Sequence, residues 1–369
     1  MEPFKFGCIV VDEHYCARPQ LEKEVRRHIV GGQNLLIQGE RRRGKSSLVV
    51  KCARSIRGMG LLYVDLLGIT NASDFCRRVA DGIAELDRSR SFLRKTAALL
   101  ASLRPLVVID RDTGLPSISI DARSAADPSS VLTVMNMVAA HARERRICVV
   151  FDEFQDILDL PDAKRVLAEL RGKIQFMSDT SFVFLGSVRN QMSEIFSHPK
   201  SPFFKSALEI SIGGMSDESF VKFIQGRFAG ARRTVDADFV RKVITDLDGV
   251  PGDIQELCDA LWSVTDTDDH VDTTKLDAAY RHIFAHEGSS YETYIKLLTL
   301  HQRRILGALA SVGGVHVNSN AFLDSAGCHN ASSVKKALVR LAEVGHVYQY
   351  NGTWKFTSPF FCEWVRRRT

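Results

Sequence analysis

The hydrophobic and polar positions in the first half of the chain alternate between short apolar runs and longer amphipathic stretches. The apolar runs predict strands at residues 35–38, 61–66, 149–151 and 182–185. Helical spacing of the apolar positions predicts helices at residues 45–57, 72–102 and 129–143. Strands that alternate with helices indicate an α/β core with a parallel sheet.

One segment interrupts this alternation. Residues 105–122, PLVVIDRDTGLPSISIDA, contain two short β-rich stretches joined by Arg-Asp-Thr-Gly. This pattern predicts a hairpin insertion over residues 105–120. It is either a surface for a partner or a hairpin that covers an edge of the sheet.

Residues 215–286 show amphipathic helical patterns such as SDESFVKFIQGRF and no strand signal, which predicts an all-helical lid. The Asp-rich run TDTDDHVDTT at residues 265–274 lacks the glycine and the terminal glutamate of a calcium loop. We interpret it as a solvated connector.

The last part of the chain has the pattern of a winged helix-turn-helix. Helices are predicted at residues 298–312, 319–327 and 331–345, followed by a hairpin at 347–356 whose Asn-Gly pair favours a tight turn. Phe360, Phe361 and Trp364 are expected to pack on the core of this module. The third helix carries hydroxyl and basic side chains that suit DNA phosphates and base edges: Ser332, Ser333, Lys335, Lys336 and Arg340. Winged helices also serve as interdomain or protein-binding modules.

The charge is unevenly distributed along the 369 residues. The chain has 49 Lys and Arg and 44 Asp and Glu, a net charge of +5. Residues 298–369 hold nine basic and three acidic residues, a net +6, so the remainder is −1. A basic tail suggests an anionic partner such as double-stranded DNA.

Length and composition indicate a multidomain protein. A chain of 369 residues with 45% apolar residues exceeds one typical hydrophobic core. We expect a core at residues 1–212, a lid at 213–290 and a winged helix-turn-helix at 291–369. The eight cysteines are scattered singly and are expected to be reduced. No apolar run reaches the roughly 20 residues of a membrane span, and the N-terminus lacks signal-peptide features, so we expect a cytoplasmic protein.

A phosphate-binding motif lies between the first predicted strand and helix. Gly39, Gly44, Lys45 and Ser46 form the pattern G-x-x-x-x-G-K-S after the strand NLLIQ and before the helix SSLVVKCARSI. Such a P-loop turns backbone N–H groups toward phosphates, with the lysine on the β- and γ-phosphates and the serine hydroxyl on Mg²⁺. ATP or ADP with Mg²⁺ is therefore expected, and Ser47 is a further nucleotide-binding candidate.

A second strand ends in two acids. Asp152 and Glu153 follow the apolar run 147–151, which suits a strand buried on both faces. Asp152 is expected to hold Mg²⁺ through water, and Glu153 to orient the attacking water. The alternative is that both are solvated charges at a strand end.

A third strand is followed by Ser187 and Arg189. Ligands of doubly wound sheets bind beyond the carboxyl ends of the strands, so both residues are candidate γ-phosphate sensors. Arg189 as an ordinary surface residue is the alternative.

Four segments together, GERRRGKSSL, VVFDEFQ, FLGSVR and LDGVPGDIQEL, carry a family resemblance. The chain resembles the prokaryotic and archaeal branch of the STAND-type ATPases, relatives of AAA+ proteins and of replication initiators, over most of its length. The resemblance implies a P-loop NTPase of the AAA+/STAND type with a helical lid and a C-terminal winged helix-turn-helix. It also makes a phosphate-sensing role for Arg189 the favoured interpretation.

The resemblance implies further nucleotide contacts. Tyr15 and Arg18 occupy an N-terminal motif that borders the adenine, although Ala17 replaces a frequent glycine. Gly249 and Pro251 match a Gly-x-Pro element of the lid whose proline packs against the adenine.

Three consecutive arginines lie inside the phosphate loop. Arg41 and Arg42 match the paired arginines of the family, and Arg43 is an addition. We expect one arginine near the nucleotide or an interface and the others exposed, and Arg43 pointing to solvent is the simpler alternative. Lys205 lies where some relatives have an arginine finger, so catalysis between subunits is in doubt, although oligomerisation stays open.

These patterns indicate a slow ATPase that acts as a nucleotide-driven switch and presents its winged helix to DNA. The alternative is an ADP-retaining switch whose winged helix is autoinhibitory or binds a protein. A purely structural nucleotide is disfavoured by Glu153.

Overall fold

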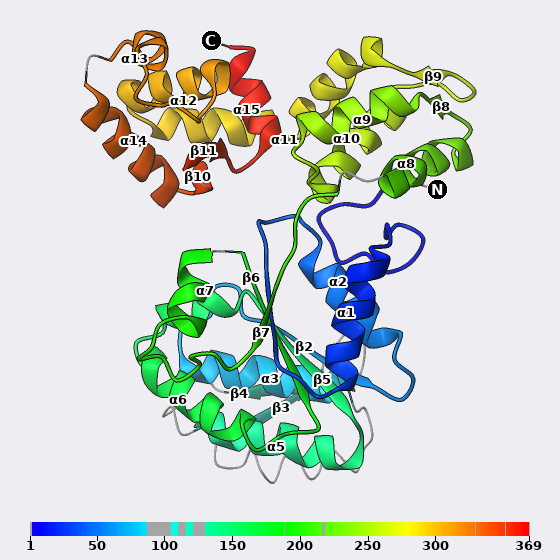
Figure 1. The fold of residues 1–369 in the computed structure, drawn as a ribbon, viewed down its shortest axis with the longest axis vertical. Helices are drawn as coiled ribbons and strands as arrows, with labels where there is room; N and C mark the ends of the chain where they lie inside the picture. Colours follow the sequence, from blue (N-terminus) through cyan, green and yellow to red (C-terminus); the bar gives the residue numbers. More distant parts are fainter. Residues whose placement is uncertain are drawn as a thin grey trace. The chain divides into compact units, whose positions relative to one another are not determined.

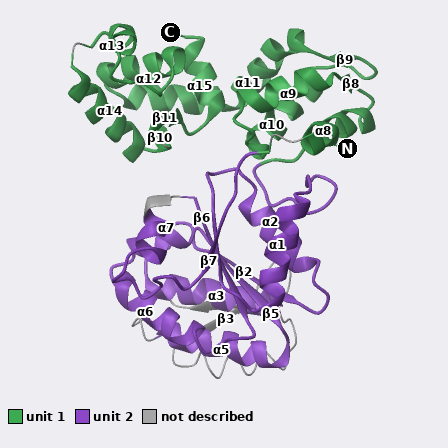
Figure 2. Cartoon of the chain, viewed as in Figure 1, with its two compact units in different colours: residues 1–6, 215–369 green, residues 7–214 purple. Residues whose placement is uncertain are grey.

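The chain is described by a computed structural model that covers residues 2–86, 105–109, 116–120, 130–187, 189–215, 218–328, 330–350 and 352–368. For residues 105–109, 116–120 and 189–190 only the backbone is described. The chain forms two compact units. Residues 7–214 are the first unit along the chain, which is purple and labelled unit 2 in Figure 2. Residues 1–6 with 215–369 are the second, which is green and labelled unit 1 there. The chain therefore passes from one unit to the other twice. The three domains expected from the sequence stay a prediction, because helical lid and winged helix fall in one unit.

A five-stranded sheet forms the centre of the first unit, with all its neighbouring strands parallel. Its order is β2-β5-β6-β1-β7. The strands are β1 (Leu35–Gln38), β2 (Gly60–Asp65), β5 (Ile147–Asp152), β6 (Ser181–Gly186) and β7 (Leu208–Ser211). The interior strands β1, β5 and β6 are buried along their whole length, as their continuous apolar runs require.

Helices cover both faces of this sheet (Figure 1). One face packs against α1 (Pro19–Val30) and α2 (Lys45–Arg54). The other packs against α3 (Ala72–Leu86), α5 (Ser130–Glu144), α6 (Ala163–Ile174) and α7 (Arg189–Phe196). Side chains of the interior strands alternate between the two cores, so that Phe182 and Phe184 face one core while Val183 and Leu185 face the other.

Some predicted boundaries change. The predicted helix at 45–57 ends at Arg54, and the part of the predicted 72–102 helix beyond Leu86 lies outside the described residues. Strand β7 was missed because only Ile210 of its four side chains is buried at the sheet edge. A short 3-10 helix, Phe154–Asp159, follows β5.

The predicted hairpin is present. β3 (Pro105–Ile109) and β4 (Pro116–Ile120) pair antiparallel, with Val107 opposite Ile118. They form a two-stranded sheet of their own, and β4 lies beside α3. Neither of these described strands pairs with the main sheet, and the two alternatives, a partner surface or a hairpin that covers a sheet edge, stay predictions.

The second unit begins with helices α8 (Glu218–Gly230), α9 (Ala237–Asp246), α10 (Pro251–Ser263) and α11 (Leu276–Leu297). The expectation of helices alone needs a correction, because β8 (Thr234–Val235) and β9 (His270–Val271) form a short parallel pair. A 3-10 turn, Thr273–Lys275, leads into α11, and its cap Asp272 accepts a hydrogen bond from the Thr274 backbone. The Asp-rich run is thus a connector, as expected.

The winged helix-turn-helix follows. Its helices are α12 (Leu300–Val312), α13 (Asn320–Ala326) and α14 (Ala331–Glu343), and its hairpin is β10 (Val347–Tyr350) with β11 (Thr353–Phe356). The final helix α15 (Pro359–Arg366) buries Phe360, Phe361 and Trp364, as predicted. Gly314 is required here, since a Cβ would lie 1.8 Å from the carbonyl oxygen of Trp354.

Candidate nucleotide-binding site

The phosphate loop connects β1 to α2 and depends on two glycines. A Cβ at Gly39 would lie 2.8 Å from the Ile212 carbonyl oxygen, just beyond β7. Gly44 adopts a φ of +83° directly before α2, a conformation that favours glycine. The loop therefore packs closely on the end of β7 and enters α2 with free N–H groups at the helix N-terminus.

Lys45 lies under the loop. Its side chain is buried, and Nζ donates hydrogen bonds to the carbonyl oxygens of Gly39, at 2.9 Å, and Glu40, at 3.0 Å. Burial lowers the pKa of Lys45, whereas the carboxylates of Glu153 and Asp152 oppose this shift. The amine is thus held between the loop and the acids at the end of β5.

Asp152 at the end of β5 is bound on both carboxylate oxygens. Oδ2 accepts a hydrogen bond from Ser46 Oγ at 2.5 Å and another from the Tyr63 hydroxyl, and Oδ1 accepts one from the Glu153 backbone at 2.9 Å. The structure therefore brings together the two predicted metal ligands, Ser46 and Asp152. The sequence pattern does not indicate this role of Tyr63, because a tyrosine within an apolar strand is predicted to be a core residue.

Glu153 has a left-handed backbone, with φ +48°. Its Oε2 accepts hydrogen bonds from Gln155 Nε2 at 2.6 Å and from Ser187 Oγ at 2.7 Å. Ser187, predicted as a phosphate sensor, thus contacts the predicted catalytic acid. Arg189 is the first residue of α7, but its side chain lies outside the described residues.

The three loop arginines differ. Arg43 is buried, with a relative exposure of 7%, and its Nε donates to Glu40 Oε2 at 3.0 Å. Arg41 and Arg42 are exposed. The alternative in which Arg43 points to solvent is therefore wrong, since this residue forms an ion pair inside the loop.

Arg18 joins the phosphate loop to the end of the first unit. Its Nη2 donates to the Arg43 carbonyl oxygen, and its Nη1 donates to the Gly213 carbonyl oxygen, both at 3.0 Å. Gly213 immediately precedes the boundary at Gly214. Arg18 is thus bound to protein backbone at both ends of its guanidinium group.

Two more residues predicted to bind the nucleotide, Ser47 and Tyr15, lie on α2 or beside it. The Ser47 hydroxyl accepts a hydrogen bond from the Val10 backbone at 3.0 Å, and Lys51 Nζ donates to the Val11 carbonyl oxygen at 2.6 Å. The Tyr15 ring lies 5.9 Å from Lys51 Nζ, and burial raises the pKa of the Tyr15 hydroxyl. The side chain of Ser47 therefore holds the N-terminal segment against α2.

Pro251 belongs to the second unit. It is buried and begins α10. Gly249 before it has a φ of +62°, and a Cβ there would lie 2.7 Å from the Met215 carbonyl oxygen. Its own carbonyl oxygen accepts a hydrogen bond from the Met215 N–H at 2.8 Å.

The residues of the first-unit site fit a nucleotide with Mg²⁺. A loop that ends at a helix N-terminus beside a buried amine suits phosphate groups. Ser46 and Asp152 offer a hydroxyl and a carboxylate, which are hard oxygen donors of the kind that Mg²⁺ prefers together with phosphate oxygens and water. Within the described part of the chain, no group of three or more His, Cys, Asp or Glu residues forms a metal site from protein alone.

Two groups of basic residues in the winged helix have different surroundings. Lys335 and Lys336 are exposed on α14 and form no ion pair among the described residues. The C-terminal arginines are bound internally instead. Arg366 and Arg367 pair with Glu363, and Arg367 also pairs with Asp277 of α11.

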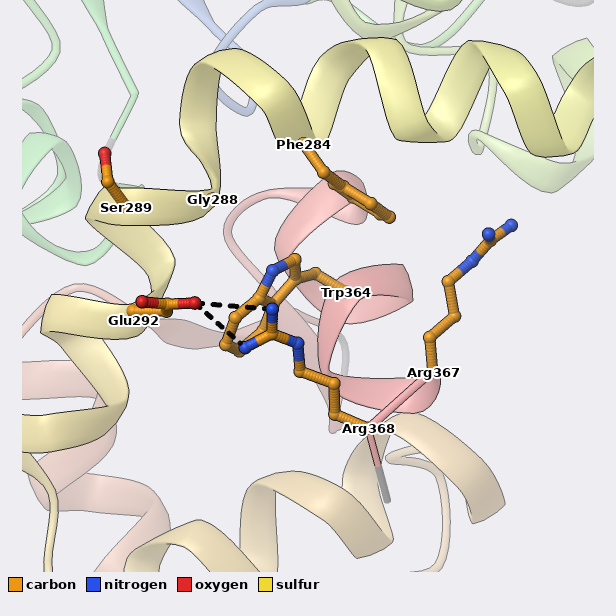
Figure 3. A pocket seen from close by; sticks show the side chains of 7 residues that line it. All are labelled: Phe284, Gly288, Ser289, Glu292, Trp364, Arg367 and Arg368. Carbon is orange, nitrogen blue, oxygen red and sulfur yellow. Dashed lines mark hydrogen bonds and ion pairs between the residues drawn. The ribbon is translucent and has the colours of Figure 1, made fainter.

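Arg368 lines a pocket of about 340 Å³ between α11 and α15 (Figure 3). Its guanidinium lies 3.9 Å from the centroid of the Trp364 ring and 3.3 Å from Glu292 Oε1. Much of the tail's positive charge therefore lies in ion pairs and aromatic contacts within the same unit.

The fold and the site together define a P-loop ATPase fold with a C-terminal winged helix. Residues 289–367 match a family model described as a probable winged helix domain. No curated protein sequence matches the chain. None of the described helices is long and apolar enough to span a membrane.

Archaeal proteins are among the structural neighbours, and one of them is described as a Walker-type ATPase. The Walker-type ATPase of Pyrococcus abyssi is similar with a TM-score of 0.63 and 15% identity, over 96% of this chain and 97% of that chain. The ORC2 protein of Aeropyrum pernix in its ADPNP-ADP complexes gives a TM-score of 0.57 at 12% identity, over 97% and 95%. Its ADP form gives 0.50 at 13%, over 99% and 96%. At these identities the likeness shows the fold alone.

Proposed function

We propose that the chain is an ATPase of the AAA+/STAND type, a switch whose nucleotide state controls its winged helix. One observation carries the proposal: Lys45, Ser46, Asp152 and Glu153 converge at the carboxyl ends of β1 and β5. This combination serves phosphoryl transfer to water, which needs positioning and charge stabilisation more than covalent chemistry. The nucleotide-binding forms of the ORC2 neighbour agree with this assignment.

Each residue has a proposed role. Loop N–H groups and Lys45 bind the phosphates, and Ser46 with Asp152 holds Mg²⁺, which would supply positive charge to the phosphate oxygens. Glu153 orients the attacking water, and Ser187 sets the position of its carboxylate. Arg41 and Arg42, which are exposed, contact the nucleotide or a neighbouring element.

The remaining assignments concern the N-terminal segment and the strand end before α7. Tyr15 and Arg18 border the adenine, and Arg189 senses the γ-phosphate. The core, lid and winged helix correspond to residues 1–212, 213–290 and 291–369. Turnover is slow, because Lys205 stands where some relatives have an arginine finger.

The first test is the steady-state rate of ATP hydrolysis. The wild-type chain is expected to release phosphate, and Glu153→Gln to bind MgATP with similar affinity while hydrolysing it at least 100-fold more slowly. Glu209→Gln, an exposed substitution on β7, is the matched control. Equal hydrolysis by Glu153→Gln and wild type would assign catalysis to another residue, and no nucleotide binding by wild type would remove the proposal.

The same assay with duplex DNA at low and moderate salt tests the partner. Stimulation that fades with salt is expected if the winged helix contacts DNA phosphates. A rate that ignores DNA would favour the second candidate, an ADP-retaining switch with a protein partner. Two exposed leucines at the junction of α11 and α12 favour that candidate, because Leu297 is 79% and Leu300 65% exposed.

A further inference from the structure

Tyr63 extends the proposed site beyond its expected residues. It lies on β2, in register with Val150 of β5, two positions before the pair Asp65 and Asp152. Its ring packs on the core between the sheet and helices α1 and α2, the side of the sheet from which the phosphate loop enters α2. The hydroxyl donates a hydrogen bond to Asp152 Oδ2.

The hydroxyl is not needed for packing. A phenylalanine would fill the same space, so the contact with Asp152 is the difference between the two side chains. A phenol is protonated at neutral pH, so the Tyr63 hydroxyl can donate its proton to the Asp152 carboxylate. Ser46 and Tyr63 therefore donate to the same oxygen while the Glu153 backbone donates to the other.

We propose that Tyr63 is a positioning residue of the nucleotide site, which orients the Asp152 carboxylate toward the divalent cation that accompanies the nucleotide. This inference rests on the proposed ATPase function. A carboxylate that supports a cation through water must keep one orientation, and outer hydrogen bonds to such ligands typically change metal affinity 10- to 100-fold. With only Ser46 and one backbone N–H, Asp152 would lose the donor that approaches from the neighbouring strand.

The test is a Mg²⁺ titration of Tyr63→Phe, read by the binding of a fluorescent ADP analogue. The Mg²⁺ concentration that gives half of the increase in nucleotide affinity is expected to rise at least about 10-fold. Nucleotide affinity in EDTA and thermal unfolding without nucleotide are expected to match wild type, which a merely structural role would not predict. Tyr294→Phe, which removes a hydroxyl from a half-exposed ring in the other unit, is the matched control.

A double-mutant cycle distinguishes an effect that passes through Asp152 from a general loss of folded structure. In an Asp152→Asn background, Tyr63→Phe is expected to cause no further change in the Mg²⁺ midpoint, because its effect passes through Asp152. An unchanged midpoint in the single variant, or an equal additional shift in the Asp152→Asn background, would overturn the inference. Wild-type binding that does not respond to Mg²⁺ would instead contradict the proposed function.

Discussion

Three consecutive arginines of the phosphate loop have different surroundings. Arg43 is buried against Glu40, and its carbonyl oxygen accepts a hydrogen bond from Arg18. Arg41 and Arg42 face solvent. The three arginines therefore have different roles. Arg43 stabilises the loop itself through its buried ion pair with Glu40.

A second charged position at the residue scale is Asp259 on α10. Burial, Glu2 and Glu256 raise its pKa to about 6. An unfolded chain gives up this proton near pH 4, whereas the folded chain keeps it to about pH 6. The folded state thus binds more protons between these values, and its stability falls as pH rises through this interval.

Asp259→Asn is therefore expected to stabilise the protein at pH 7.5. The gain is about 1 kcal/mol, because solvent screens a partly exposed carboxyl. It should shrink as pH falls from 6 toward 4, and thermal unfolding at pH 7.5 and 4.5 measures it. Asp324→Asn, an exposed residue of α13, is the control. A gain that is independent of pH would contradict the assignment to Asp259 ionisation.

At the scale of elements, the turn before α10 depends on one glycine. Gly249 has a φ of +62°, and its Cα approaches the backbone of Met215 too closely for a Cβ. Gly249→Ala is expected to reduce the free energy of unfolding by about 1–3 kcal/mol through backbone strain and this contact.

Denaturant unfolding of Gly249→Ala, compared with Gly230→Ala, measures the effect. Gly230 ends α8 with open space around it, so alanine there is expected to be neutral or slightly stabilising. Equal stability of the two variants would show that the turn relaxes without cost.

At the scale of the whole molecule, the chain passes between its two units at residues 6–7 and 214–215. Residues near each passage form contacts inside their own unit. Phe4 packs on Phe228 of α8, and Val10 is held by Ser47 of α2. The second passage follows Gly213, whose carbonyl oxygen binds Arg18. Near the first passage, Val10 is therefore bound to α2, and near the second passage Arg18 links Gly213 to the phosphate loop.

The charge distribution gives a second prediction at this scale. Replacing Lys335 and Lys336 together by alanine is expected to weaken duplex DNA binding and to reduce the slope of log affinity against log salt by about 2. Filter binding over a range of salt concentrations measures the slope.

Arg368→Ala is the matched control for those lysines. It removes one positive charge, but a charge that packs on Trp364, so it should lower stability by about 0.5–1 kcal/mol and leave the salt slope unchanged. A slope unaffected by the double lysine variant would exclude α14 as the DNA contact.

The sequence by itself determined the order of the elements and the chemistry of the site. Near-continuous apolar runs predict the buried strands β1, β5 and β6, because strands covered by helices on both faces have few polar positions. The glycine-lysine-serine motif and the acids at the end of β5 predict the nucleotide site, because their spacing and flanking elements follow local rules. Helical spacing and an Asn-Gly turn likewise predict the winged helix.

Only the tertiary structure decided which side chains meet. The contact of Tyr63 with Asp152 depends on the pairing of β2 with β5, strands separated by more than 80 residues. The strand β7 forms because its backbone pairs with that of β1 at the edge of the sheet, although its own side chains are mostly exposed. The burial of Arg43 and the internal pairing of the C-terminal arginines arise in the same way, since a charge count shows neither the direction of a side chain nor its partner.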